Sequence, residues 1–197
     1  MSARMPVRTD MTARDAGRPG RFGGGRRRRA SLGAAALLSA AGVLASGAAP
    51  AQAYSPNPKV TAVYRDTSTC PCSGGALTDP YDSTSFARDP GGYAVKLSLK
   101  KGSSFVGKVE FHPNDEKLWV YDTKNDNDTI YVHITYTSGR TTHDLGTYTA
   151  PATAAVADHM TKDFDIPEGA GVDISVYDDA RLTDYIGGAR GTGGAVA

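Results

Sequence analysis

The feature that most constrains the fold is an alternation of apolar and polar residues, with a period of two, in short segments. Within residues 93–100 the odd positions are apolar, whereas Lys96, Ser98 and Lys100 occupy even positions. Successive side chains of a β-strand point to opposite faces, so this pattern predicts a strand with one face in the core and the other in water. An amphipathic helix would instead repeat every 3.6 residues.

Similar segments recur along the chain and are separated by Gly, Pro, Asn and Asp, which favour turns. The predicted strands are 60–64, 93–100, 105–112, 117–122, 129–136, 142–149, 159–166 and 172–177. Seven or eight short strands of this kind favour an all-β fold, an antiparallel two-sheet β-sandwich, with a small β-barrel as the alternative. The polar residues 123–128 predict a hairpin loop between the two strands that flank them.

The first 53 residues have the layout of a secretory signal peptide. A positive block at Arg26–Arg29 precedes an uncharged run from Ala30 to Ala53, which ends in Ala-Gln-Ala. Basic, apolar and small-x-small segments in this order are typical of a cleaved export signal. The run is also long enough for a membrane anchor, but its Ala- and Gly-rich composition favours cleavage after Ala53. We therefore predict that residues 1–53 are removed and that a secreted chain begins at Tyr54.

The segment Arg28-Arg29-Ala30-Ser31-Leu32 resembles a twin-arginine export motif, with Ser31 where a bulky apolar residue is usual. Together with the Arg-rich leader and the Ala-Gln-Ala ending, it is similar to the leaders of small secreted proteins of high-GC actinobacteria, many of which have no assigned function. The resemblance implies export, by the twin-arginine or the general secretory route, and it implies no site residue.

The charge of the predicted mature chain differs from that of the whole sequence. Residues 54–197 hold thirteen Lys and Arg against nineteen Asp and Glu, a formal net charge of −6, whereas the whole sequence carries +1. A mildly acidic domain offers no basic surface for phosphates, so nucleic acid is not an expected partner. Because no basic amphipathic stretch follows Ala53, no membrane contact is expected after cleavage.

Three regions of the predicted mature chain differ in composition. Residues 54–92 combine the N-terminal strand with an irregular loop, rich in Pro, Gly and Ser, that contains both cysteines. Residues 93–186 hold the other strands and form the predicted β-sandwich core. Residues 187–197 are rich in Gly, and we predict that they form a flexible tail.

Both cysteines lie in the segment Cys70-Pro71-Cys72, and an exported protein meets an oxidising compartment. We therefore predict a local disulfide between Cys70 and Cys72. Such a bond would make the loop rigid, but it would stabilise the whole fold little because it closes so short a loop. Free or intermolecular thiols and a soft-metal clamp are the alternatives. A metal is disfavoured because a structural zinc site uses four ligands.

No motif predicts a metal, a cofactor or a catalytic centre. The acidic segment 122–128 has oxygen ligands suited to calcium, but Lys124 stands where an EF-hand places an oxygen ligand, and no Glu closes the loop. Asn and Asp also occur in loops because they tolerate left-handed backbone conformations, which is the favoured interpretation. No metal-binding or catalytic spacing relates the four histidines, His112, His133, His143 and His159.

Aromatic residues supply the one candidate binding surface. If the neighbours of Trp119 point into the core, Trp119 and Tyr121 lie on the opposite face, and the same alternation places Tyr131 and His133 together. On adjacent strands, these four residues would form a flat aromatic platform suited to sugar rings or to a protein partner. The alternative is that they only stabilise the sheet through cross-strand pairs.

These observations leave three functional hypotheses. The first and preferred one is a non-enzymatic secreted β-sandwich that binds an extracellular polysaccharide, cell wall or protein through its surface. The second is a secreted protease inhibitor that presents the loop around Cys70 and Cys72. The third is a hydrolase with carboxylate or histidine chemistry, which no catalytic motif supports.

The intact mass of the protein recovered from culture medium tests export and disulfide formation together. We expect a monomer that begins at Tyr54 and gains the mass of two hydrogens on reduction, because cleavage follows Ala53 and Cys70 bonds to Cys72. Alkylation should label the chain only after reduction. A disulfide-linked dimer, a metal adduct or two free thiols in the secreted protein would contradict the predicted local disulfide.

Overall fold

Short β-strands joined by turns make up the described chain, residues 54–151, 153, 156–191 and 194–197 of a computed structural model. The predicted signal peptide at 1–53 lies outside these residues. The described part includes the short 3-10 turns η1 (Thr67–Thr69), η2 (Gly75–Leu77) and η3 (Asn114–Glu116). No helix there is long and apolar enough to cross a membrane. The predicted all-β fold is confirmed.

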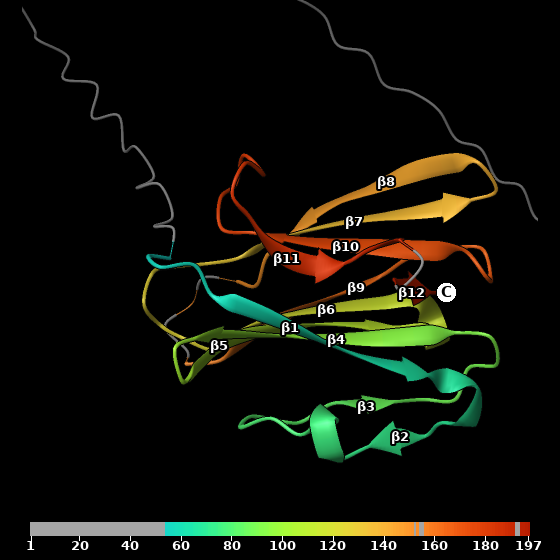
Figure 1. Cartoon of the computed structure of the whole chain (residues 1–197), viewed down its shortest axis with the longest axis horizontal. Helices are drawn as coiled ribbons and strands as arrows, with labels where there is room; N and C mark the ends of the chain where they lie inside the picture. The colour runs from blue at the N-terminus through green and yellow to red at the C-terminus, as the bar shows by residue number, and fades with distance from the viewer. Residues whose placement is uncertain (1–53, 152, 154–155, 192–193) are drawn as a thin grey trace, which may run out of the picture. The chain divides into compact units, whose positions relative to one another are not determined.

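Most of the strands form one large, curled antiparallel sheet. Its order is β8 (Thr141–Tyr148), β7 (Tyr131–Ser138), β10 (Gly171–Tyr177), β12 (Ala195–Val196), β4 (Tyr93–Lys101), β5 (Ser104–His112), β6 (Lys117–Asp122) and β9 (Asp158–Asp163). In addition, β1 (Lys59–Asp66) pairs with β4, and β11 (Tyr185–Ala189) pairs with β10. The sheet curls so that β7, β8, β10 and β11 lie over β1, β4, β5 and β6 (Figure 1). This two-layer arrangement confirms the predicted β-sandwich.

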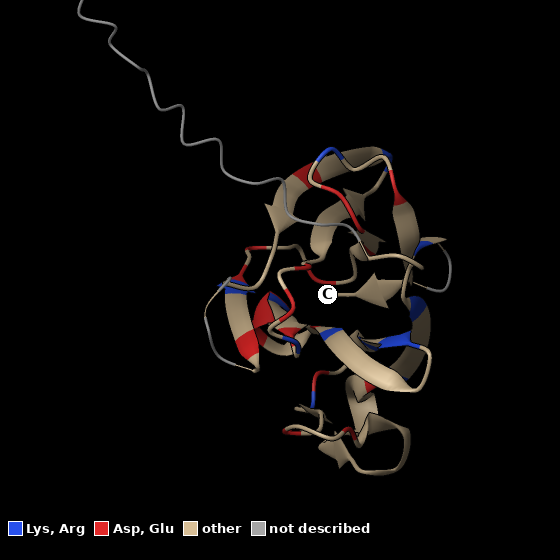
Figure 2. Ribbon diagram, turned by 90° about the vertical axis from the view of Figure 1, so that its left-hand side faces the viewer, with Lys and Arg blue, Asp and Glu red and all other residues tan. Residues whose placement is uncertain are grey.

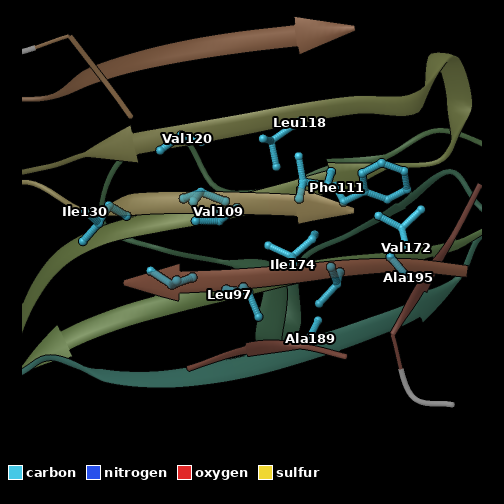
Figure 3. Close-up of a cluster of buried hydrophobic side chains, with 14 of the residues drawn as sticks. Leu97, Val109, Phe111, Leu118, Val120, Ile130, Val172, Ile174, Ala189 and Ala195 are labelled. Atoms are coloured by element: carbon cyan, nitrogen blue, oxygen red, sulfur yellow. The ribbon is translucent and has the colours of Figure 1, made fainter. Parts of the chain in front are cut away.

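The core lies between the two layers and is filled by side chains from alternate strand positions (Figure 3). Leu97 and Leu118 are fully buried on one layer, and Val132 and Ile174 are fully buried on the other. These are the positions that the period-two pattern assigns to the interior, which is why the sequence located β1 and β4 to β10 to within a few residues. The sequence did not predict the shorter strands β11, β12, β2 (Cys72–Ser73) and β3 (Ser85–Phe86). Burial of each such side chain contributes about 1.5–3 kcal/mol and holds the layers together.

The predicted hairpin between residues 117–122 and 129–136 is wrong. β6 pairs with β5 and β9, whereas β7 pairs with β8 and β10. The residues between β6 and β7 therefore connect the two layers. The short connections before β6 and after β7 decide this outcome. They bring β5 next to β6 and β7 next to β8, so each strand already has a nearby partner. The turn between β7 and β8 uses Gly139 at φ 63°.

The prediction of a flexible tail at 187–197 is wrong for the part of it that the structure describes. This segment contributes to β11 and β12, and its buried side chains are Ala189, Ala195 and Ala197. Its glycines permit close backbone approach: a Cβ on Gly188 would lie 2.1 Å from the carbonyl oxygen of Ile174. The composition that suggested mobility therefore serves tight packing of one strand against another.

Residues 67–92 form a small lobe with an apolar centre of its own, here named the disulfide lobe, which lies below β4 in Figure 1. Within it, β2 (Cys72–Ser73) pairs with β3 (Ser85–Phe86). Leu77 and Phe86 are buried together with Ala94 of β4. Cys70 and Cys72 form a disulfide, as predicted. The irregular loop expected from composition is thus a defined layer on the outer face of the sheet.

Replacing Gly188 with Ala tests the placement of the C-terminal strands. We expect the free energy of unfolding to fall by about 2–3 kcal/mol, because the added methyl group must displace the backbone of β10. Gly171→Ala in β10 is the matched control, since a Cβ there meets nothing within 4 Å, and its effect should stay within about 0.5 kcal/mol. Equal, small effects in urea unfolding would indicate that 187–197 is a mobile tail.

Candidate functional site

Two lysines of the central strands are buried beneath the disulfide lobe. Lys96 of β4 and Lys108 of β5 are both 0% exposed. The sequence pattern places Lys96 on a solvent-exposed face, and this expectation is wrong because a segment outside the pattern covers that face. A buried ammonium group is costly unless it is paired with a charge and fully hydrogen-bonded. The lobe must therefore supply partners for both lysines.

Asp79 of the disulfide lobe bridges the two ammonium groups. The Nζ of Lys96 donates to Asp79 Oδ2 and to the carbonyl oxygen of Leu77, each at 2.8 Å. The Nζ of Lys108 donates to Asp79 Oδ2 at 3.0 Å and to the carbonyl oxygen of Ser83 at 2.9 Å, and it also pairs with Asp82. These contacts tie the lobe to two neighbouring strands of the sheet.

Glu110 of β5 extends this charged cluster toward the surface. Its Oε1 accepts a hydrogen bond from the Thr84 hydroxyl at 2.6 Å and lies 2.9 Å from the Nζ of Lys108. Its Oε2 lies 2.9 Å from Nε2 of His112. Because Glu110 is buried and His112 is partly exposed, the histidine is the member of this group that can meet a ligand.

The pKa values of this cluster favour fixed charges. Burial alone would raise the pKa of Asp79, but hydrogen bonds from Lys96, the Tyr81 N–H and Lys108 outweigh it and lower the pKa to about 2. Hydrogen bonds likewise outweigh burial and lower the pKa of Glu110. Burial would lower the pKa of Lys108, yet its carboxylate partners raise it. A general acid or base needs a pKa near the working pH, so the cluster is suited to anchoring.

A cleft of about 410 Å³ lies between the disulfide lobe and the outer face of β5 and β6. From the lobe it is lined by Pro71, Ser85, Phe86 and Ala87, and from the sheet side by His112, Asn114, Asp115, Lys117 and Trp119. Its volume falls in the range of ligand-binding clefts. The lining combines an aromatic surface with side chains that donate and accept hydrogen bonds.

Trp119 reaches this cleft and belongs to a row of nearly parallel rings on β6 and β9. Its ring centre lies 6.1 Å from that of Tyr121 and 5.7 Å from that of His159, with interplanar angles of 13° and 22°. Tyr121 is buried, its hydroxyl donates to Asp82 at 3.0 Å, and the Nζ of Lys108 lies 4.3 Å from its ring centre. The charged cluster therefore fixes the neighbour against which Trp119 stacks.

The structure brings together two of the four predicted platform residues. Trp119 and Tyr121 share β6, but Tyr131 and His133 lie on β7, which pairs with β8 and β10. There, Nε2 of His133 lies 3.1 Å from Oδ1 of Asp144. The platform as predicted does not form, because it depended on the hairpin that the sheet topology replaces.

His112 and His159 are residues of the aromatic surface that sequence reasoning missed. His159 pairs with Tyr121 across β9 and β6, strands that are distant in the sequence, so no local pattern marks it. A usable signal exists for His112, because Lys108, Glu110 and His112 follow a period of two within β5 and share one face. Three charged or polar residues on one face of an otherwise apolar strand indicate a buried polar contact.

The acidic segment near the end of β6 lines a smaller cavity of about 120 Å³. Burial raises the pKa of Asp122 to about 6, and the carboxylates of Asp126, Asp158 and Asp128 add to this effect. In the described ranges, no group of three or more His, Cys, Asp or Glu converges to hold a metal ion. Asn127 has φ 64°, which supports the interpretation of this segment as a loop with a left-handed residue.

Removing the bridging carboxylate tests whether the charged cluster holds the lobe in place. Asp79→Asn should lower the free energy of unfolding at pH 7 by about 3 kcal/mol, because Lys96 and Lys108 lose their shared counter-charge. Asp115→Asn removes an exposed pair with Lys117 and should change it by less than about 0.5 kcal/mol. Urea unfolding monitored by the fluorescence of Trp119 measures both values.

The acid dependence of the same variant gives an independent check. The pKa of Asp79 is lowered in the folded chain, so its stabilising effect is complete above about pH 4 and is lost as the pH falls through about 2. The difference between the original protein and Asp79→Asn should therefore shrink between pH 4 and pH 2. A difference that stays constant over this range would contradict the assigned contacts.

The charge distribution agrees with the mildly acidic composition. Figure 2 shows acidic and basic segments of the described ribbon interspersed on this side of the molecule, with no broad basic region. Comparison of the chain with protein-family models, with curated proteins and with solved structures finds no match. The chemistry of the cleft beside Trp119 is therefore the basis for inferring what this β-sandwich does.

Proposed function

We propose that this protein is a secreted, non-enzymatic β-sandwich that binds an extracellular polysaccharide at the cleft beside Trp119. The observation that carries the proposal is a partly exposed tryptophan on a central strand, next to a cleft lined by hydrogen-bonding side chains. Cell-wall polymers belong to this class of ligand. A protein partner is the alternative occupant of the same surface.

The composition of the cleft suits a sugar ring. The apolar C–H face of a sugar packs on an aromatic ring, while its hydroxyl groups need donors and acceptors around the edge. Trp119 and Phe86 supply aromatic surface, and His112, Asn114 and Lys117 supply polar groups. Asp115 is exposed and Lys117 is partly exposed, so the cleft is accessible at this rim.

The rigidity of both walls also supports binding. One wall is the β-sheet, and the other is the disulfide lobe, which the ion pairs of Asp79 hold on the sheet. Within the lobe, the Cys70–Cys72 bond makes its own short loop rigid. A preformed cleft loses little conformational entropy when a ligand binds.

The other two hypotheses receive less support. Glu110 is buried and its pKa is lowered, which is opposite to the shift that a carboxylic acid catalyst of a glycosidase needs. Cys70 is buried in the centre of the disulfide lobe. A loop seated on the sheet in this way is less suited to inhibition of a protease than a protruding one.

Secretion rests on two independent features. The order of basic, apolar and small residues before Tyr54 is that of an export signal. The Cys70–Cys72 disulfide is of a kind that persists in oxidising compartments.

Co-sedimentation with insoluble polysaccharide and cell-wall fractions tests the proposal. We expect the original protein to bind and Trp119→Ala to lose at least about tenfold in affinity, because the aromatic surface of the cleft is removed. Tyr131→Ala is the matched control, since Tyr131 lies on β7 away from the cleft, and its binding should be unchanged.

Fluorescence of the original protein provides the solution measurement. Trp119 is the only tryptophan of the chain, so soluble fragments of the bound polymer should shift its emission. An unchanged spectrum together with no co-sedimentation would contradict polysaccharide binding. Binding that survives removal of the glycan from the cell wall would favour a protein partner.

A further inference from the structure

Asp178, directly after β10, is a buried carboxylate that lacks an ordinary partner. It is 1% exposed, and within the described chain neither of its side-chain oxygens makes a hydrogen bond of ordinary geometry. Its own backbone N–H donates to the carbonyl oxygen of Asp184 at 2.9 Å, which fixes its position. An ionised carboxylate in such a place is costly unless a cation accompanies it.

Tyr54, the first described residue, lies beside this carboxylate. Its side chain is 3% exposed and belongs to the main hydrophobic core, so the position of its backbone is fixed. Its backbone N–H is close enough to Asp178 to favour the ionised form of that carboxylate. The Nζ of Lys101 lies 5.4 Å from the centre of the Tyr54 ring, on a different part of the residue.

The surroundings of the Tyr54 backbone nitrogen are acidic. Burial raises the pKa of Asp178 to about 6, and the carboxylates of Asp184, Asp128 and Asp179 add to the increase. Burial and then nearby carboxylates, including Asp178, also raise the pKa of the Tyr54 hydroxyl. The carboxylate contributions to both shifts favour an additional positive charge here, whereas burial itself disfavours any unpaired charge.

The peptide bond that precedes Tyr54 is the predicted cleavage site after Ala53. Hydrolysis by a signal peptidase adds one water across this bond: the carbonyl carbon of Ala53 receives the oxygen, and the C–N bond breaks. The products at neutral pH are a carboxylate on Ala53 and an α-ammonium group on Tyr54. A neutral group with one N–H thereby becomes a cation with three.

We infer that the α-ammonium group of Tyr54, released by cleavage after Ala53, pairs with the buried carboxylate of Asp178 and completes the fold of the mature protein. This inference rests on the proposed export signal and is independent of what the cleft beside Trp119 binds. Three N–H donors can serve both oxygens of Asp178, where the peptide group offers one. Removal of the leader thus supplies the missing counter-charge, and the mature chain is more stable than its precursor.

Stability falls with rising pH in both forms, but over different pH ranges. In the uncleaved chain the pKa of Asp178 is raised above its ordinary value of 3.8, so stability falls as the pH rises from about 4 to about 6. In the mature chain the ammonium group removes this loss. The pKa of the α-amino group is then raised above its ordinary value near 8, so its contribution is complete below about pH 8 and is lost as the pH rises through the folded value.

Three forms of the folded chain test the pairing. The first is 54–197 with a free Tyr54 amine, the second is the same chain acetylated at Tyr54, and the third is 51–197, which retains Ala-Gln-Ala. By urea unfolding at pH 7, we expect the free amine to raise the equilibrium constant for folding at least about tenfold over both other forms. In the Asp178→Asn background this ratio should fall below about twofold.

Two further measurements separate pairing from a general effect of the variant. Asp163→Asn, in an exposed part of β9, should leave the tenfold ratio intact. The pKa of the α-amino group, measured by NMR on nitrogen-labelled protein, should lie above 8 and return to about 8 in Asp178→Asn. Equal stability of the free and acetylated chains, or a normal α-amino pKa in the original sequence, would overturn the inference. So would a secreted chain whose mass shows a start other than Tyr54.

Discussion

The buried contact of Lys96 and Lys108 with Asp79 is the interaction on which the arrangement of this protein depends. Two neighbouring strands place ammonium groups on the same face of the sheet, and those groups cannot remain buried without a negative partner. Asp79 supplies that partner from the disulfide lobe, so the sheet and the lobe are stable only together. Apolar contacts of Leu77 and Phe86 add area to the same interface. The charges fix the orientation and position of the lobe on the sheet, because an ion pair with several hydrogen bonds tolerates little displacement.

The cleft follows from the way the lobe is anchored. Its two walls, the sheet and the lobe, are joined by the contact just described. Glu110 links the buried Lys108 to His112 at the cleft surface. Trp119 lies in the same neighbourhood, stacked beside a tyrosine whose hydroxyl bonds to Asp82 of the lobe. A substitution that breaks the ion pairs should therefore also alter the packing of Tyr121 and Trp119. On the proposed function, the charged residues in the interior hold the binding surface in one conformation.

Directly after β10, a buried carboxylate lacks such a partner within the described chain. Asp178 has no compensating side chain in the described residues, and the acidic groups around it make the deficit larger. A cation produced by processing at Tyr54 would remove that deficit without any additional side chain. The two sites thus follow the same physical rule, that a buried charge requires a partner. In one case the partner is encoded in the lobe, and in the other, by our inference, cleavage of a peptide bond supplies it.

The sequence by itself determined the longer strands, the all-β fold and the local disulfide. Alternation with a period of two is a local property of a half-buried strand, and cysteines two residues apart can meet without the rest of the chain. Only the tertiary structure decided which strands are neighbours, and this separated Tyr131 and His133 from Trp119. It also decided that Lys96 is buried and that the Gly-rich segment after residue 186 forms strands. The reason is that strand pairing and burial by a distant segment depend on contacts between residues far apart in the chain. A local pattern shows which residues of a strand share a face, but it does not show what will cover that face.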